Sequence, residues 1–342
     1  VANSALEGTI LARLGSLESQ AIAYGNPNPN VIINGGMDIW QRGTTLSAVP
    51  GFNNYGAADR WKYYNGVSGS TCSVSRQAFV PGAAPFAGYE SAYYQRIALS
   101  GYTSGTFDFQ TAVEDVRTFA GQVVTFSFFA KAAATTVLSL FLQQTMGSGG
   151  SGTTTVNLSS QTITTSWARY SITTTLGSLA GATIGDNSNL NVLMRINSNA
   201  TLDFWGVQLE KGSVATAFRR NAPNIQAELA ACHRYYWRAA SLATATNFSL
   251  GIAVTSTLFL ATITPKVPFR VIPTLEASAN STLEIRTGGA SSISSLGLEP
   301  TTTTELVTLN AAVTALTAGQ AGLLRSTASG ATTAFIALSA EL

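Results

Sequence analysis

Short strand-like runs that recur between Val31 and Ala222 limit what this 342-residue chain can fold into. They are rich in Val, Ile, Thr and aromatic residues, as in Val123–Ala130, and are separated by turn-forming stretches such as the Gly- and Ser-rich residues 147–152. Comparable runs cover residues 136–143, 153–158, 167–175, 190–196 and 202–209. Because no helical period separates them, the spacing predicts a jelly-roll β-sandwich over residues 26–222.

The composition agrees with a mainly β chain. Charged residues make up 11% of the sequence, less than half of the roughly 25% usual in soluble domains. The sequence instead contains 43 Thr, 35 Ser and 31 Gly. Thr is β-branched and carries a hydroxyl, so it suits the solvent-facing side of a strand. The length is sufficient for two buried cores.

Residues 3–23 show a helical period before the first strand-like run. Ile10, Leu14, Leu17 and Ala21 follow one another at steps of four, three and four, the spacing of a coiled-coil seam. Such a stripe could pack on its own domain or could join copies of the chain. We predict the second: residues 1–25 form a short helix for oligomerisation or attachment. Pro27 and Pro29 then break the helix.

A change of pattern after Pro223 predicts a second part of the chain. Ile225, Leu229 and Cys232 have helical spacing, so residues 223–240 are predicted to be a connecting helix and strand. Further strand-like runs follow from residue 241 to residue 342. We predict that they form a smaller C-terminal β-sandwich, a distal domain of usual size.

Charge and cysteine content exclude several classes of protein. The net charge is +2 and no run of five basic residues occurs, so nucleic-acid binding is not expected. No stretch of 18 apolar residues predicts membrane insertion, and the N-terminal segment lacks the apolar core of a signal peptide. Cys72 and Cys232 are expected to be free apolar thiols, with neither a disulfide framework nor a zinc site.

Candidate catalytic groups are few, and the chain is not predicted to be an enzyme. His233 is the only histidine and lies among apolar residues, and no GxSxG motif is present. A glycosidase needs two carboxyl groups held a few ångström apart, and nothing in the sequence fixes such a pair. The candidate carboxylates are Asp38, Asp59, Asp108, Glu114, Asp115, Asp186 and Asp203.

Aromatic residues beside Gly and Asn are the clearest candidate binding residues. Sugar rings stack their C–H faces on aromatic rings, while amide side chains bond to sugar hydroxyls. The segment from Trp61 to Gly66 and the nearby Tyr55 fit that chemistry. The predicted glycan-binding residues are Tyr55, Tyr63, Tyr64 and Asn65. Alternating aromatics can equally fill a core, and Trp40, Trp61, Trp167 and Trp205 are predicted to do so.

Three segments together resemble a known module. Asn34–Gly43, Ala58–Trp61 and Gly206–Glu210 are similar to the strands that open and close the carbohydrate-binding-module-like jelly rolls of phage tail fibres and other virion attachment proteins. Related sugar-binding modules often hold a structural calcium through one acid at each of these strands. Asp38 fits the first place, whereas the second holds Trp205 and Gly206, with Asp203 two residues earlier. No cofactor is therefore expected, with Asp38 and Asp203 as weak calcium candidates.

The resemblance implies a phage tail fibre that adheres to the host cell surface through glycans. It further implies a homotrimer on the virion, made in the host cytoplasm and attached to other virion proteins through the N-terminal helix. Two alternatives remain open. One is a capsid-borne head fibre, knob or decoration protein, because such modules occur there too. The other is a glycan-degrading tail spike.

Overall fold

The computed structural model describes residues 30–342 except 87–89, 243–244 and 329–331. The described chain is mainly β, which confirms the predicted fold class. It divides into two compact units, one that extends to Leu229 and a second over Ala230–Glu341. The proposed oligomerisation residues Ile10, Leu14, Leu17 and Ala21 lie outside the described residues. Among the described helices, none is long and apolar enough to cross a membrane.

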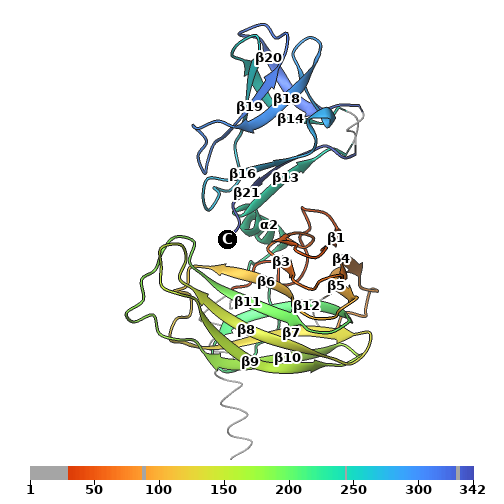
Figure 1. Cartoon of the computed structure of the whole chain (residues 1–342), viewed down its shortest axis with the longest axis vertical. Coiled ribbons are helices and arrows are strands. Elements are labelled where there is room, and N and C mark those ends of the chain that lie inside the picture. Colours follow the sequence, from red (N-terminus) through yellow and green to blue (C-terminus); the bar gives the residue numbers. More distant parts are fainter. Residues whose placement is uncertain (1–29, 87–89, 243–244, 329–331) are drawn as a thin grey trace, which may run out of the picture. The chain divides into compact units, whose positions relative to one another are not determined.

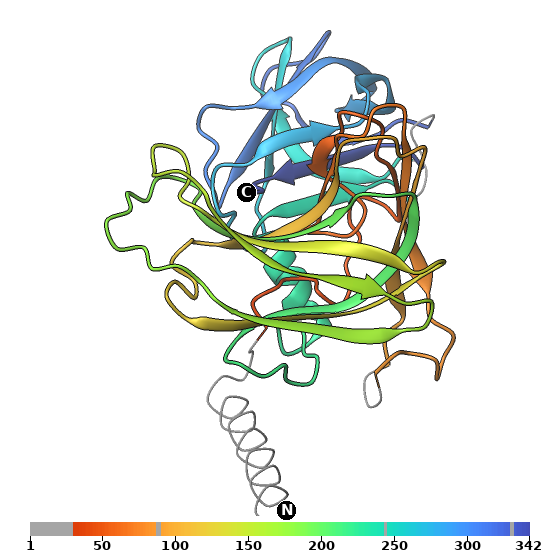
Figure 2. The same ribbon diagram turned by 60° about the horizontal axis from the view of Figure 1, so that its bottom comes forward.

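The first unit is a jelly-roll-like sandwich of two six-stranded antiparallel sheets (Figure 1). Sheet A has the order β1 (Thr45–Ser47), β4 (Thr71–Ala78), β5 (Tyr93–Ser100), β12 (Ala200–Lys211), β7 (Val123–Ala132) and β10 (Ala168–Thr175). Sheet B has the order β2 (Asn53–Tyr55), β3 (Lys62–Asn65), β6 (Phe107–Glu114), β11 (Asn189–Ile196), β8 (Thr136–Thr145) and β9 (Thr154–Ile163). Figure 2 shows the long strands of residues 123–211, coloured yellow to green, running beside one another.

Strand alternation builds the core between the two sheets. Along β7, Val124, Phe126 and Phe128 are buried in the main hydrophobic cluster. Sheet B contributes residues such as Phe109 and Met194, which are fully buried in the same cluster. Burying one such side chain contributes about 1.5–3 kcal/mol to folding. The intervening residues of each strand point to the opposite, outer face of their sheet.

Both cysteines are buried, as predicted for apolar thiols. Cys72 lies within the core of the sandwich. Burial raises the pKa of its thiol to about 12, because the charged thiolate is poorly solvated there.

The two motifs that suggested a jelly roll lie side by side in the structure. The Val31 amide donates to the Leu209 carbonyl, and the Val207 amide donates to the Gly35 carbonyl. A Cβ at Gly35 would lie 2.0 Å from the Val207 carbonyl oxygen, so only glycine allows this close approach. The closing motif is part of β12. The opening motif is a loop rather than a strand, because Asn34 and Met37 have φ of 57° and 55°.

A short helix and a strand lie within the predicted connecting segment, as α2 (Ile225–His233) and β13 (Tyr236–Ala240). Glu228 of α2 accepts hydrogen bonds from the backbone amides of Asn34, at 2.5 Å, and Ala222, at 2.9 Å. Its side chain is buried, and desolvation raises the pKa of this carboxyl. The division between the two compact units falls inside α2, between Leu229 and Ala230.

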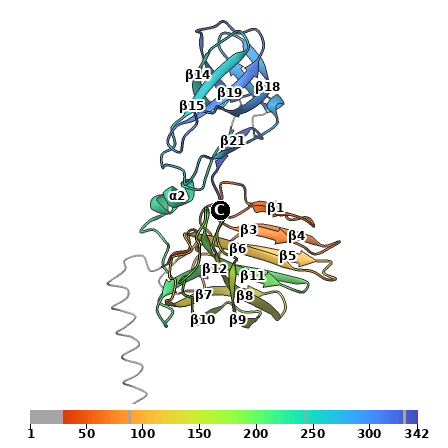
Figure 3. The same ribbon diagram turned by 60° about the vertical axis from the view of Figure 1, so that its left-hand side comes forward.

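The second unit contains a three-stranded sheet and a closed six-stranded barrel. The sheet has the order β13, β21 (Phe335–Ser339) and β16 (Thr274–Ala277). The barrel has the order β14 (Asn247–Ala253), β15 (Leu258–Ile263), β19 (Val307–Val313), β18 (Ala290–Leu298), β17 (Leu283–Arg286) and β20 (Ala321–Ser326). Figure 3 shows the curved strands of the barrel. The core of the second unit includes Phe259 and Leu309.

The barrel is a more specific arrangement than the predicted small sandwich. β14 pairs with both β15 and β20, so the sheet closes on itself. Closure gives a hydrogen-bonding partner to the two edges that an open sheet would leave exposed. The sequence pattern predicted these strands but contained no information about whether they would close.

Candidate functional site

The outer face of sheet B carries the best candidate site of the first unit, and we call it the sheet B face. Strand pairing places its side chains in rows that cross the sheet. One row runs from Tyr64 to Asp108, Arg195 and Ser139. The neighbouring row is Lys62, Gln110, Leu193, Phe141 and Asn157, and the next is Ala112, Asn191, Gln143 and Thr155.

An ion pair stands at the centre of the first row. Arg195 donates from Nε and Nη2 to the two carboxylate oxygens of Asp108, at 2.6 and 2.8 Å. The hydrogen bond to Asp108 raises the pKa of Arg195, so the guanidinium stays charged. Its Cζ also lies 5.1 Å from the ring centroid of Phe141. These contacts fix a flat cation beside an aromatic ring in the middle of the sheet.

Two aromatic rings lie on either side of that pair. Tyr64 of β3 is 37% exposed and lies against Gly66, where a Cβ would come within 2.6 Å of the tyrosine hydroxyl. Phe141 of β8 is half-buried. β6 and β11 lie between the two strands, so three strand spacings separate them, roughly 14 Å. That span suits an oligosaccharide better than a single sugar.

Amide side chains accompany the rings: Gln110 and Asn191 lie on the two strands between them, and Gln143 lies on the same strand as Phe141. Asn191 Nδ2 donates to Gln110 Oε1 at 3.3 Å, and Gln143 Nε2 donates to Thr155 Oγ1 at 3.4 Å. Both distances lie at the long end for such bonds, so a ligand hydroxyl can replace either partner at little cost. Each amide offers both donors and an acceptor, as sugar hydroxyls require.

The structure separates the four residues predicted to bind glycans. Tyr64 lies on the sheet B face. Tyr55 of β2 is half-buried, with the guanidinium carbons of Arg42 and Arg60 at 5.5 and 5.9 Å from its ring centroid. Tyr63 and Asn65 are fully buried, so the prediction is wrong for these two.

The prediction failed because successive side chains of a strand point to opposite faces of the sheet. Tyr63 and Tyr64 are adjacent in β3, so they point to opposite faces. The Tyr63 hydroxyl bonds to Gln95 Oε1 at 2.5 Å, and Asn65 Nδ2 donates to the Ala48 carbonyl at 2.7 Å. Burial also raises the pKa of Tyr63 well above its usual value.

Sequence reasoning missed the larger part of this face. Phe141, Gln143, Asn191 and Arg195 lie in two runs that were predicted as strands. In each run the alternate residues, such as Leu140 and Val192, are apolar and buried. The residues between them therefore had to face outward. That alternation was the signal that could have identified them.

The two weak calcium candidates are each paired with basic groups. Asp38 lies 2.8 Å from Arg220, and Asp203 lies 2.7 Å from Arg96 and 3.6 Å from Lys131. No group of three or more His, Cys, Asp or Glu residues that could hold a metal ion is found within the part of the chain that the structure describes. A calcium ligand set needs more oxygen atoms than either carboxylate supplies.

Of the remaining carboxylates considered for catalysis, Asp108 and Asp115 form ion pairs with Arg195 and Arg117. His233 is half-buried, and desolvation together with Lys266 lowers the pKa of its imidazole.

The outer face of sheet A has a different character. Phe79, Tyr94, Phe129, Trp205 and Phe218 form a buried aromatic cluster there, with Phe86 and Trp167 packed against it. The Trp205 ring packs at a tilt against the rings of Phe218 and Phe129, with ring centroids at 4.8 and 5.3 Å. Trp61 and Trp205 are fully buried, as predicted, whereas Trp40 and Trp167 are half-buried.

Comparison with known proteins found similar solved structures only. No protein-family model matches the chain, and no curated protein matches it. A CBM4 structure has 17% identity and a TM-score of 0.32, covering 52% of this chain and 98% of that one. The C-terminal family 22 carbohydrate-binding module of Clostridium thermocellum Xyn10B has 14% identity and a TM-score of 0.33, covering 46% and 89%. The family 11 module of Clostridium thermocellum Lic26A-Cel5E has 15% identity and a TM-score of 0.31, covering 50% and 98%.

Proposed function

We propose that the first unit binds glycans on the sheet B face and does not cleave them. The observation that carries the proposal is the pair of rings, Tyr64 and Phe141, with Arg195 and amide side chains between them. Rings of this kind bind the apolar faces of sugars, and the amides and the guanidinium bond to hydroxyls. The bidentate pairing of Asp108 with Arg195 supports a binding role, since it occupies the carboxylate at the centre of the face.

We further propose that the chain serves as a phage tail fibre that attaches the virion to a host glycan. The resemblance of Asn34–Gly43 and Gly206–Glu210 to virion attachment modules supports this role. A flat sheet surface that exposes few rings favours weak binding at each site. Several copies on one particle, as in a homotrimer, would multiply the effective affinity.

A glycan array tests the binding site. We expect the full chain to bind a subset of oligosaccharides and the Phe141→Ala variant to bind them about tenfold more weakly, the loss that one aromatic contact of about 1.4 kcal/mol produces. Tyr93→Ala is the matched control, because Tyr93 is a half-buried aromatic residue of sheet A. Equal losses in the two variants would count against the sheet B face.

Two measurements test the place on the particle and the absence of cleavage. Electron microscopy of particles labelled with antibody to this chain should show label on the tail; label on the capsid would favour a head fibre or decoration protein.

Incubation with host envelope polysaccharide should release no reducing ends. If reducing ends are released by the wild type and not by the Asp108→Asn variant, the chain is a glycan-degrading tail spike rather than a binding module.

A further inference from the structure

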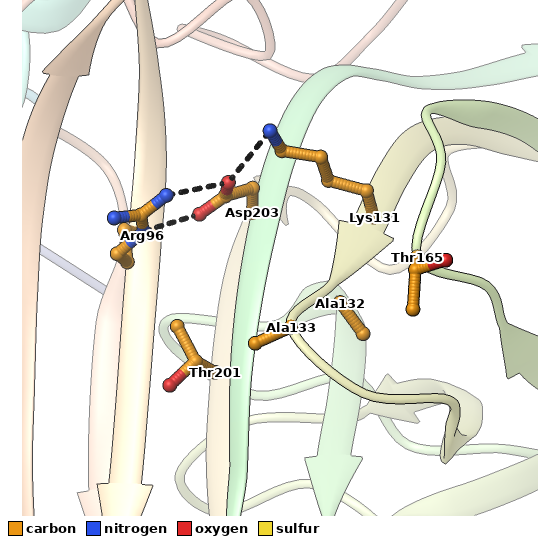
Figure 4. Close-up of a pocket in the computed structure, with 7 residues that line it drawn as sticks. All are labelled: Arg96, Lys131, Ala132, Ala133, Thr165, Thr201 and Asp203. Carbon is orange, nitrogen blue, oxygen red and sulfur yellow. Dashed lines mark hydrogen bonds and ion pairs between the residues drawn. The ribbon is translucent and has the colours of Figure 1, made fainter.

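A second polar site lies on the outer face of sheet A, beside the aromatic cluster. It is a pocket of about 300 Å³ lined by Arg96 of β5, Lys131 and Ala132 of β7, Thr201 and Asp203 of β12, and the loop residues Ala133 and Thr165 (Figure 4). A volume of that size is at the low end for ligand pockets. It has room for one sugar ring rather than a chain.

The pocket holds two cations and one carboxylate. Asp203 is 4% exposed in its side chain, while Arg96 and Lys131 are 36% and 31% exposed. The lining residues therefore carry a net charge of +1, and the positive groups are the accessible ones. In Figure 4 both cationic side chains converge on Asp203 from opposite sides.

Asp203 does not use all the donors of its partners. Arg96 gives Nε and Nη2 to the two carboxylate oxygens, at 2.7 and 2.9 Å, which leaves Nη1 for another acceptor. Lys131 Nζ is 3.6 Å from Asp203, an ion-pair distance that is longer than a hydrogen bond. Asp203 thus positions both cations at the pocket.

The other walls suit a sugar. Ala132, Ala133, Thr201 and Thr165 also line the pocket (Figure 4). The ring centroids of Trp167 and Tyr94 lie 5.4 and 5.9 Å from Lys131 Nζ, so aromatic surface adjoins the charged end. A free inorganic anion would satisfy the cations but would leave the rest of this space without contacts.

We propose that this pocket binds one acidic sugar residue, with its carboxylate or sulfate group held by Lys131 Nζ and attracted by the charge of Arg96. The hydroxyls of Thr201 and Thr165 would contact the sugar ring. Charge-assisted hydrogen bonds of this kind are about twice as strong as neutral ones. The site is separate from the sheet B face, and it gives the chain a preference for acidic glycans that the sheet B face does not supply.

Calorimetric titration of the full chain tests this proposal, with a galacturonic acid trimer, a sulfated galactose trimer and a neutral galactose trimer as probes. We expect at least one acidic probe to bind about tenfold more tightly than the neutral one. The stronger of the two acidic probes identifies the group. Equal binding of all three probes, or binding of none, would overturn the proposal.

Two variants locate the effect. Lys131→Gln should abolish the preference for the acidic probe, and Lys211→Gln, an exposed lysine at the end of β12, should preserve it. Thr201→Val is a second test that leaves every charge in place and should weaken the acidic probe by a few fold. An acidic preference that survives Lys131→Gln would contradict the site. Phe141→Ala should leave this preference intact, so failure of the sheet B face and failure of the pocket are distinguishable.

Discussion

The outer faces of sheets A and B come from the same strand alternation, yet a second core covers part of the first face, beside the pocket at Asp203, and no such core covers the second. On sheet A, Phe79 and Phe218 lie beyond the ends of β4 and β12 and fold back onto Tyr94, Phe129 and Trp205. On sheet B, no comparable buried cluster covers the outer face among the described residues. Residues next to the strands, together with aromatic residues in the strands, thus decide how much of each face remains available to a ligand.

The largest effect expected from this comparison is on stability. Trp205→Ala should lower the free energy of unfolding by about 3–5 kcal/mol, because it removes a fully buried ring from the cluster on sheet A. Phe141→Ala on sheet B should cost about 1 kcal/mol or less, since its ring is only half-buried. Urea denaturation of both variants checks the difference, and similar losses would remove the distinction between the two faces.

A smaller effect is expected from the ion pairs on the two faces, Arg195 with Asp108 on sheet B and Arg96 with Asp203 on sheet A. Arg195→Ala should cost about 1–3 kcal/mol, because it leaves Asp108 buried without its partner. Arg96→Ala should cost less, because Lys131 still lies 3.6 Å from Asp203. Arg117→Ala is the control, since that exposed pair with Asp115 should contribute no more than about 0.5 kcal/mol. Thermal unfolding of the three variants would contradict this ranking if Arg96→Ala were the most destabilised.

The smallest effect is a pH dependence that comes from neither face. The pKa of Glu228 is raised in the folded chain, so the folded state holds this proton more strongly than the unfolded state does. The stabilisation that protonated Glu228 contributes is therefore complete below the pKa of this carboxyl in the unfolded chain. It is lost as the pH rises through the higher pKa that the carboxyl has in the folded chain. Glu228→Gln does not titrate, so urea midpoints measured from pH 4 to pH 7 should decline more steeply for the wild type than for the variant. Parallel profiles would show that burial of this carboxyl does not affect stability.

The sequence was sufficient for the class of fold and for many strands. Runs such as Val123–Ala130 and residues 190–196 became β7 and β11, because apolar alternation and β-branched residues determine strands locally. The opening motif became a loop because Asn34 and Met37 adopt positive φ, which residue type alone does not reveal. The closure of the barrel depends on the pairing of β14 with β20, whose paired residues are 69 to 78 positions apart in the sequence.

The candidate sites were harder to predict than the fold. Aromatic residues close together in sequence, Tyr63 and Tyr64, proved to lie on opposite faces of β3. Residues far apart in sequence, Asp108 and Arg195, proved to be in contact. Asp203, a weak calcium candidate in the sequence, forms ion pairs with Arg96 and Lys131 from two other strands. A site on a sheet is assembled across strands, so it requires the register, which the sequence pattern did not supply.

The most direct test of the central claim is a calorimetric titration of the best array glycan into the wild type and into the double variant Tyr64→Ala/Phe141→Ala. The double variant should remain folded, with a free energy of unfolding within about 2 kcal/mol of the wild-type value. The account predicts that it binds the glycan roughly a hundredfold more weakly, the combined effect of losing two aromatic contacts. Undiminished affinity in the double variant would contradict the assignment of the sheet B face as a glycan-binding surface.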